Sequence, residues 1–182
     1  CDRVDRALAW ARAALADAPG AEPLDAPVLL AHLLGVQRAA LHAHPERPLT
    51  PEQTADFRRM IEGRRRGVPV AYLTGRRAFF DREFAVSPAV LIPRPETEHL
   101  IEAALAWARG RAGLRVADVG TGSGAIAVTL AAHLPDAAVW AIDVSEEALA
   151  VARENAARAG VEARITWLGG DLLSPLLAHT FR

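Results

Sequence analysis

The sequence has 182 residues, of which 51% are hydrophobic and 24% are charged, and its formal net charge is −1 at pH 7. This length fits one large domain or two small ones, and so small a net charge excludes a strong overall attraction to nucleic acid or to an anionic membrane. The single cysteine, Cys1, excludes an intrachain disulfide, and no apolar run is long enough to cross a bilayer. These features favour a cytoplasmic protein with no membrane partner and no direct nucleic-acid partner, and we also expect it to be a monomer.

The first part of the chain is expected to form a small all-α helical bundle. Apolar residues recur at helical spacing from Val4 to Leu15, and a second helix is predicted from Asp25 to the terminating Gly35. Residues 36–49 are predicted to form a short helix and a loop. The sequence Thr50-Pro51-Glu52-Gln53 combines a capping residue, a proline and a capping-box glutamine, so it predicts the start of a further helix, which fades near Gly67.

A linker with strand character follows. Aromatic and β-branched residues stand between turn formers over residues 78–93, and the pattern predicts a β-hairpin, or two short strands, that turns at Ser87-Pro88. Pro95 is predicted to begin a helix with acidic residues in its first turn, where the helix dipole favours them. The apolar face expected for this helix comprises Leu100, Ile101, Ala104, Leu105 and Ala108, and the tryptophans expected in the core are Trp10, Trp107, Trp140 and Trp167.

The rest of the chain alternates between short strands and helices. Strands are predicted at residues 116–119, 139–142 and 165–168, with helices at 124–133 and 145–160 between them. This βαβαβ order predicts an α/β fold with a parallel, doubly wound, Rossmann-like sheet, of which the sequence supplies the first three strands.

The strongest chemical signal is Asp118-Val119-Gly120-Thr121-Gly122-Ser123-Gly124, directly after the first predicted strand. Glycines at this place let the backbone turn tightly and approach a ligand, although an ordinary strand-to-helix turn has the same need. A dinucleotide-binding turn is the main chemical alternative, because Gly120, Gly122 and Ala125 satisfy its variant with alanine in third place. The Gly-x-Gly-x-Gly spacing, and a strand-end carboxylate suited to an ammonium group, favour a nucleoside that carries an amino acid.

Acidic residues also follow the other two predicted strands. Asp143 ends the second strand, where a carboxylate can accept hydrogen bonds from both ribose hydroxyls of an adenosine ligand. Asp171 and Leu172 follow the third strand, where an acid and an apolar neighbour suit the amino group and the ring face of adenine. An ordinary turn is an equal alternative for these two residues.

The remaining polar clusters carry weaker signals. The six histidines show no metal-site spacing, so no metal is expected. Arg64, Arg65 and Arg66 stand at a predicted helix C-terminus, where positive charge is favourable. The alternative for these arginines is a partner-binding patch that includes Arg76 and Arg77.

Two stretches before the glycine loop resemble signatures of the peptide chain release factor N5-glutamine methyltransferases, a family of class I S-adenosylmethionine-dependent methyltransferases. They are Gly67-Val68-Pro69-Val70-Ala71-Tyr72-Leu73-Thr74-Gly75 and Val86-Ser87-Pro88-Ala89-Val90-Leu91-Ile92-Pro93-Arg94-Pro95-Glu96-Thr97-Glu98. The glycine loop and the later acidic residues follow in the family's order and spacing. The resemblance implies a helical substrate-recognition domain over residues 1–75, a β-hairpin linker over residues 76–94 and a methyltransferase domain over residues 95–182.

The resemblance also implies a reaction: methyl transfer from S-adenosylmethionine to the side-chain amide nitrogen of the glutamine in the Gly-Gly-Gln motif of a peptide chain release factor. The expected cofactor contacts are Asp118, Gly120, Thr121, Gly122, Ser123, Gly124, Asp143, Asp171 and Leu172. In the family an Asn-Pro-Pro-Tyr motif after the fourth strand orients the amide. This sequence has no such motif, so no catalytic residue is assigned and we expect the chain to be C-terminally incomplete. The alternatives are a ribosomal-protein glutamine or other class I methyltransferase, an NAD-dependent oxidoreductase, and a module that binds cofactor without catalysis.

Overall fold

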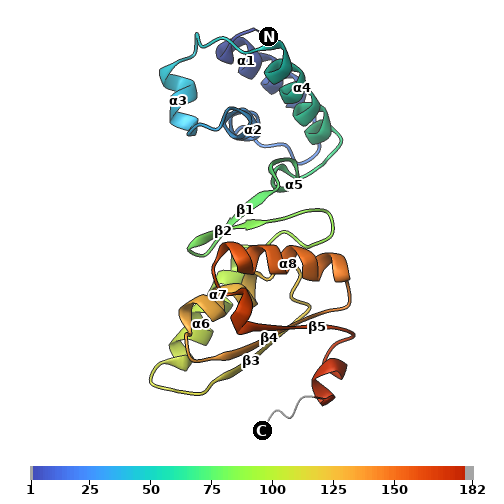
Figure 1. Cartoon of the computed structure of the whole chain (residues 1–182). Coiled ribbons are helices and arrows are strands. Elements are labelled where there is room, and N and C mark those ends of the chain that lie inside the picture. Colours follow the sequence, from blue (N-terminus) through green and yellow to red (C-terminus); the bar gives the residue numbers. More distant parts are fainter. Residues whose placement is uncertain (1, 179–182) are drawn as a thin grey trace. The chain divides into compact units, whose positions relative to one another are not determined.

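The computed structural model describes residues 2–178, and the chain divides into two compact units, Cys1–Thr74 and Gly75–Arg182 (Figure 1). The first unit is helical. Its elements are α1 (Val4–Leu15), α2 (Asp25–Leu34), α3 (Arg38–Ala43), α4 (Pro51–Arg65) and α5 (Val70–Thr74). None of the helices in the described part of the chain has the length and apolar character that crossing a membrane requires.

Local capping sets the boundaries of the helices in this unit. The Gln53 amide donates to Thr50 Oγ1 at 3.1 Å, and Gln53 Oε1 accepts from the Thr50 amide at 3.0 Å, which confirms the predicted capping box. Gly35 ends α2 with φ at 63°, also as predicted. Helix α5 lies outside the predicted elements and begins after Pro69, whose carbonyl accepts hydrogen bonds from two of its amides.

The core of the helical unit lies between α1, α2 and α4. Leu29, Leu30, Phe57 and Ile61 are almost fully buried there. Trp10 is partly buried and meets the Phe57 ring edge to face, with 6.3 Å between ring centroids. Burial of these apolar side chains is the main force that holds the helices together.

A buried ion pair joins the end of α4 to the start of α2. Arg64 Nε donates to Asp25 Oδ2 at 2.7 Å, and the same guanidinium bonds to the Gly20 carbonyl. Both charged side chains are almost completely shielded from solvent. Of the three arginines at this helix end, only Arg64 has this buried role, because Arg65 and Arg66 are exposed and pair with Glu62.

The second unit begins with a β-hairpin made of β1 (Arg76–Phe79) and β2 (Arg82–Ala85). The predicted turn at Ser87-Pro88 is therefore wrong. The chain reverses at Phe80 and Asp81, and φ at Phe80 is 57°, a value that hairpin turns usually assign to glycine. Asp81 is the only turn-forming residue at this place and has no glycine, asparagine or proline beside it, whereas Val86 and Val90 are buried in the loop after β2 and so imitate a strand pattern.

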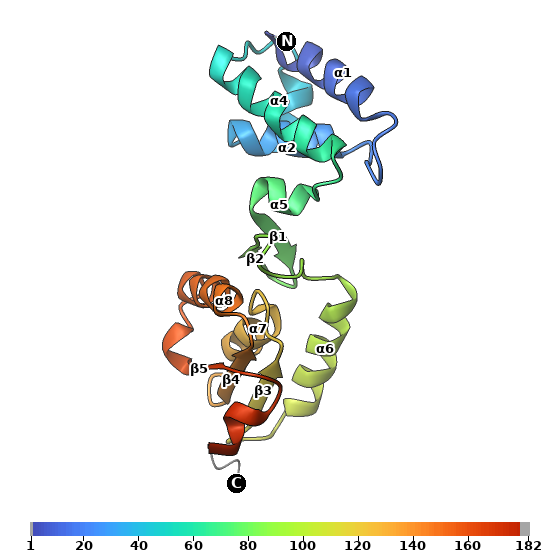
Figure 2. The same cartoon turned by 90° about the vertical axis from the view of Figure 1, so that its right-hand side faces the viewer.

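A parallel three-stranded sheet forms the rest of this unit. Its strands are β3 (Arg115–Val119), β4 (Ala138–Asp143) and β5 (Ile165–Gly169), in the order β3-β4-β5. Helices α6 (Glu96–Ala108), α7 (Ala125–His133) and α8 (Glu146–Arg158) lie on one side of the sheet in both views (Figures 1 and 2). Short 3₁₀ turns at Glu162–Arg164 and Ser174–Ala178 flank β5. This arrangement confirms the predicted α/β fold and its partial parallel sheet.

The core of the second unit lies between the sheet and its helices, with Val128, Val139 and Ala141 fully buried. Two side chains predicted to be internal are not. Leu100 is 56% exposed and Trp107 is 61% exposed, because α6 buries only the stripe through Ile101 and Ala108. Arg111 covers the Trp107 ring at 4.3 Å, which shields part of this exposed aromatic surface. Trp140 and Trp167 are partly buried.

Candidate functional site

The predicted site residues lie at one edge of the parallel sheet. The strands pair Val119 with Ile142 and Asp143 with Gly169, so their carboxyl ends are neighbours. The turns after these strands, residues 119–124, 143–145 and 169–172, therefore meet at this edge. In open α/β sheets this is the usual place for a ligand.

The glycine loop is held against β4 by its own backbone. The amides of Gly120 and Thr121 both donate to the Ile142 carbonyl, at 2.8 and 2.9 Å. The loop glycines have positive φ, and Gly124, at 78°, is also sterically required. A Cβ atom at Gly124 would lie 3.1 Å from Ala152 Cβ, so α8 packs directly on the loop.

Asp118 is buried beneath this loop and is the next-to-last residue of β3. Its Oδ2 accepts hydrogen bonds from Thr121 Oγ1 at 2.7 Å and from the Ala127 amide at 3.0 Å. Burial raises the pKa of Asp118, the two hydrogen bonds oppose that rise, and the nearby carboxylate of Asp143 adds to it. A cation placed beside this carboxylate would stabilise its charged form. The carboxylate already accepts a hydrogen bond from the Ala127 amide, in the first turn of α7.

Asp143 links the glycine loop to the end of β4. Its Oδ2 accepts from the Gly122 amide at 2.9 Å, and its Oδ1 accepts from the Ser145 amide at 3.0 Å. The residue is only half-buried, and each carboxylate oxygen has a second lone pair. Asp143 can therefore bind two further donors while it holds the loop in place.

Asp171 and Leu172 lie in the turn after β5. The Gly170 amide donates to the Asp143 carbonyl at 3.0 Å, which holds this turn beside the end of β4. Both side chains are exposed, Leu172 by 68%, and φ at Leu172 is 47°. A leucine in left-handed conformation is uncommon, and here it presents an apolar side chain at the polar edge of the sheet.

The structure adds two residues that the sequence analysis missed. Val144 follows Asp143 and is 77% exposed, so a second apolar side chain lies at the strand ends. The sequence feature that could have indicated Val144 is its place, as a β-branched residue, between an acid at the strand end and the residue that caps the next helix. Asn155 is buried on α8 and bonds to the carbonyl of Ser123 at 2.9 Å. The sequence feature that could have indicated Asn155 is an amide side chain on the apolar face of an alanine-rich helix.

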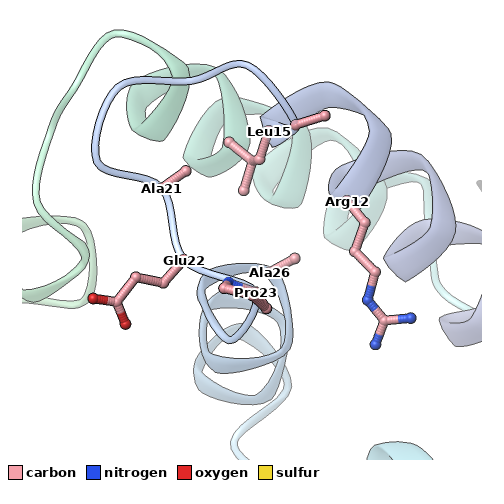
Figure 3. A pocket seen from close by; sticks show the side chains of 7 residues that line it. Arg12, Leu15, Ala21, Glu22, Pro23 and Ala26 are labelled. Carbon is pink, nitrogen blue, oxygen red and sulfur yellow. The ribbon is translucent and has the colours of Figure 1, made fainter.

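Two other features of the described residues lie outside this edge. Residues 2–178 contain no cluster of three or more His, Cys, Asp or Glu side chains suited to a metal ion. A pocket of about 300 Å³ opens in the helical unit between α1 and α2 (Figure 3). Its apolar lining includes Leu15, Pro23 and Ala26, and Arg12 and Glu22 lie on opposite sides of Pro23 and Ala26 in Figure 3.

Comparison with protein families places two domains on the chain. Residues 6–75 match the family model described as PrmC N-terminal domain. Residues 116–181 match the family model described as methyltransferase domain. The first match covers most of the helical unit, and the second covers nearly all of the three-stranded sheet and the whole candidate site.

Curated relatives match nearly the full length of the chain. A release factor glutamine methyltransferase of Bordetella pertussis is 50% identical over 91% of this chain and 60% of that protein. A protein of the same name from Bacillus subtilis is 43% identical over 94% of this chain and 60% of that protein. The chain thus spans little more than half the length of these relatives.

Solved structures match a smaller part. A SAM-dependent methyltransferase from Geobacter sulfurreducens, solved in complex with S-adenosyl-L-homocysteine, is 36% identical over 43% of this chain and 30% of that chain, with a TM-score of 0.36. A corresponding methyltransferase complex from Thiobacillus denitrificans is 33% identical over 43% of this chain and 30% of that chain, with a TM-score of 0.35.

Proposed function

Because the chain belongs to the release factor glutamine methyltransferase family, we propose that its protein methylates the side-chain amide nitrogen of the glutamine in the Gly-Gly-Gln motif of peptide chain release factors. The methyl donor in this proposal is S-adenosylmethionine, which supplies an activated methyl group from its sulfonium. An amide nitrogen is a poor nucleophile because its lone pair is delocalised into the carbonyl. The reaction therefore depends on close positioning of the two reactants.

The hydrogen bond between the Asp118 carboxylate and the Ala127 amide of α7 favours S-adenosylmethionine over a dinucleotide as the cofactor. A dinucleotide needs free amides at the first helix N-terminus for its pyrophosphate. Here the Ala127 amide already donates to Asp118, and the Gly120, Thr121 and Gly122 amides donate to Ile142 and Asp143. A buried carboxylate at this place would repel a pyrophosphate, whereas the ammonium group of an amino acid would relieve its unfavourable burial.

The other strand ends fit the remaining parts of an adenosyl ligand. We assign Asp143 to the two ribose hydroxyls, because its half-buried carboxylate has a free lone pair on each oxygen. Val144 and Leu172 are exposed apolar side chains suited to the faces of the adenine ring. Asp171 is exposed beside them, where its carboxylate can accept from the adenine amino group.

The division of labour along the chain forms part of the same proposal. Residues 1–75 would recognise the release factor, residues 76–94 would serve as a hairpin linker and residues 95–182 would bind the cofactor. We also propose a cytoplasmic monomer, since the substrate is a soluble component of translation. Size-exclusion chromatography with light scattering tests the monomer, and a mass of twice the chain would contradict it.

Methyl transfer can be measured directly on the full-length protein. The protein is incubated with S-adenosylmethionine labelled in its methyl group and with a release factor whose motif is intact or has Gln replaced by Ala. We expect label only on the intact factor. Equal labelling of both factors would refute the assignment of this glutamine as the methyl acceptor.

An NAD-dependent oxidoreductase is the second candidate function, because Gly120, Gly122 and Ala125 keep the dinucleotide spacing. Calorimetric titrations with S-adenosylmethionine and with NAD separate the two candidates. We expect heat of binding with S-adenosylmethionine alone, and tighter binding of NAD would reverse the assignment.

A further inference from the structure

Asn155 is a polar side chain on the buried face of α8. Only 3% of the residue is exposed, and its neighbours on the helix stripe are Leu149, Ala152 and Ala156. Burying an amide is unfavourable unless its donors and acceptor are all used. The partners of this amide therefore indicate what it does.

Both donor hydrogens and the acceptor oxygen of the Asn155 amide group bond to two distant backbone segments. Its Oδ1 accepts from the Ala85 amide at 2.7 Å, and its Nδ2 donates to the Ala85 carbonyl at 3.0 Å. The second Nδ2 hydrogen goes to the Ser123 carbonyl at 2.9 Å. One side chain thus joins the end of the hairpin to the glycine loop.

The hairpin contact satisfies groups that the hairpin itself leaves unpaired. The Val86 amide donates to the Gly75 carbonyl across the hairpin. Because bonded and non-bonded pairs alternate in an antiparallel ladder, the amide and carbonyl of Ala85 point away from β1. Asn155 pairs with both of them, as a neighbouring strand would.

The loop contact is reinforced by close packing one helical turn away. Ala152 lies three residues before Asn155, on the same face of α8. A Cβ atom on Gly124 would lie within 3.1 Å of Ala152. Helix α8 therefore holds two consecutive loop residues, Ser123 by a hydrogen bond and Gly124 by direct contact.

We propose that Asn155 is a positioning residue that couples the hairpin end at Ala85 to the glycine loop at Ser123, so that binding of the cofactor orders both segments together. The inference rests on the proposed function, because it assumes that the glycine loop binds S-adenosylmethionine. Asn155 need not touch the cofactor. It acts by holding the Ser123 peptide in the orientation that the loop needs.

The test compares Asn155→Ala with a control that weakens the fold elsewhere. Val139→Ala removes a buried side chain at the opposite end of the sheet from the loop. Both variants are expected to lower the melting temperature. Calorimetry with S-adenosylmethionine should show at least a tenfold loss of affinity for Asn155→Ala and less than a twofold loss for Val139→Ala.

Hydrogen exchange gives the readout that a purely structural role would not change. S-adenosylmethionine should slow exchange in peptides covering the loop, residues 119–126, and the hairpin end, residues 82–90. We expect Val139→Ala to keep both effects and Asn155→Ala to lose the effect on the hairpin. Wild-type affinity in Asn155→Ala, or protection of its hairpin by cofactor, would overturn the proposal.

Asn155→Asp keeps the test decisive if the alanine variant does not fold. The aspartate has the same shape and still accepts from the Ala85 amide, but it loses both donors and places a charge against two carbonyl oxygens. It should also lose at least tenfold in affinity, and wild-type binding would refute the coupling. If the wild-type protein binds no S-adenosylmethionine, the proposed function fails by itself. In that case hydrogen exchange of the ligand-free proteins tests the coupling. The coupling predicts that residues 119–126 and residues 82–90 both exchange faster in the Asn155 variants than in Val139→Ala, and equal rates would refute it.

Discussion

Replacing Asp143 by alanine is the sharpest test of the proposed cofactor site. The carboxylate accepts one amide hydrogen bond from Gly122 and one from Ser145, and in the proposal it also accepts the two ribose hydroxyls. Removing it leaves the Gly122 amide without its partner and takes away both ligand contacts. The variant therefore weakens binding through the loop and through the ribose at once.

The size of the effect follows from the cost of an unmade hydrogen bond. Leaving a buried group unsatisfied costs about 1–3 kcal/mol. At 25 °C this corresponds to about a 5- to 150-fold rise in Kd, since each 1.4 kcal/mol is about tenfold. The lower end applies if water replaces the carboxylate, and the upper end applies if the loop also moves.

Isothermal titration with S-adenosylmethionine measures this change, and Ser145→Ala is the matched control. Ser145 Oγ caps α8 by accepting from the Ala148 amide at 3.1 Å, so its loss costs about 1 kcal/mol of stability. The control leaves the carboxylate and its hydrogen bonds to both backbone amides intact. Unchanged affinity in Asp143→Ala, or an equal loss in both variants, would refute the ribose assignment.

Three further predictions concern stability. Gly124→Ala should be less stable than Gly120→Ala by about 1–3 kcal/mol in urea unfolding, because both need positive φ but only Gly124 lacks room for a Cβ atom; equal losses would contradict this. Burial raises the pKa of Asp118 above its ordinary value of 3.8, so the native state binds more protons than the unfolded chain above that pH and loses stability as the pH rises. Asp118→Asn should therefore gain in melting temperature relative to wild type between pH 4 and pH 7 while it weakens S-adenosylmethionine binding, and a pH-independent difference would refute the argument. Arg64→Met should destabilise the chain by about 3–5 kcal/mol, because it leaves the Asp25 carboxylate buried and unpaired. The double variant Asp25→Asn/Arg64→Met should recover much of that loss, and equal stabilities of the single and double variants would count against it.

The helix boundaries and the glycine loop could be predicted because their causes are local. Thr50 and Gln53 cap each other across three residues, and Gly35 supplies the left-handed turn that ends α2. The alternation of short apolar strands with helices likewise encodes the parallel sheet. The carboxyl-edge location of Asp118 and Asp143 follows from that alternation, since each residue lies at the end of a predicted strand.

The position of the hairpin turn depends on contacts with distant residues, so the local sequence pattern did not predict it. Phe80 takes positive φ without being glycine, and its amide donates to Glu98 Oε1 at 3.0 Å. Asp81 contacts His133 Nε2 at 3.0 Å, from the end of α7. These partners lie 18 and 52 residues away along the chain, so the position of the turn was not readable from its own residues.

The sequence by itself determined which elements form and which strand ends carry acids, because hydrogen-bonded caps, glycine dihedral angles and hydrophobic periodicity each act within a few residues. The tertiary structure decided which polar side chains are buried. Arg64 is buried because Asp25, 39 residues earlier, compensates its charge. Asn155 is buried because Ala85 and Ser123, 70 and 32 residues earlier, pair with both of its amide hydrogens and with its amide oxygen. The burial of a polar group depends on partners that folding brings together, and residues near it in the chain do not identify them.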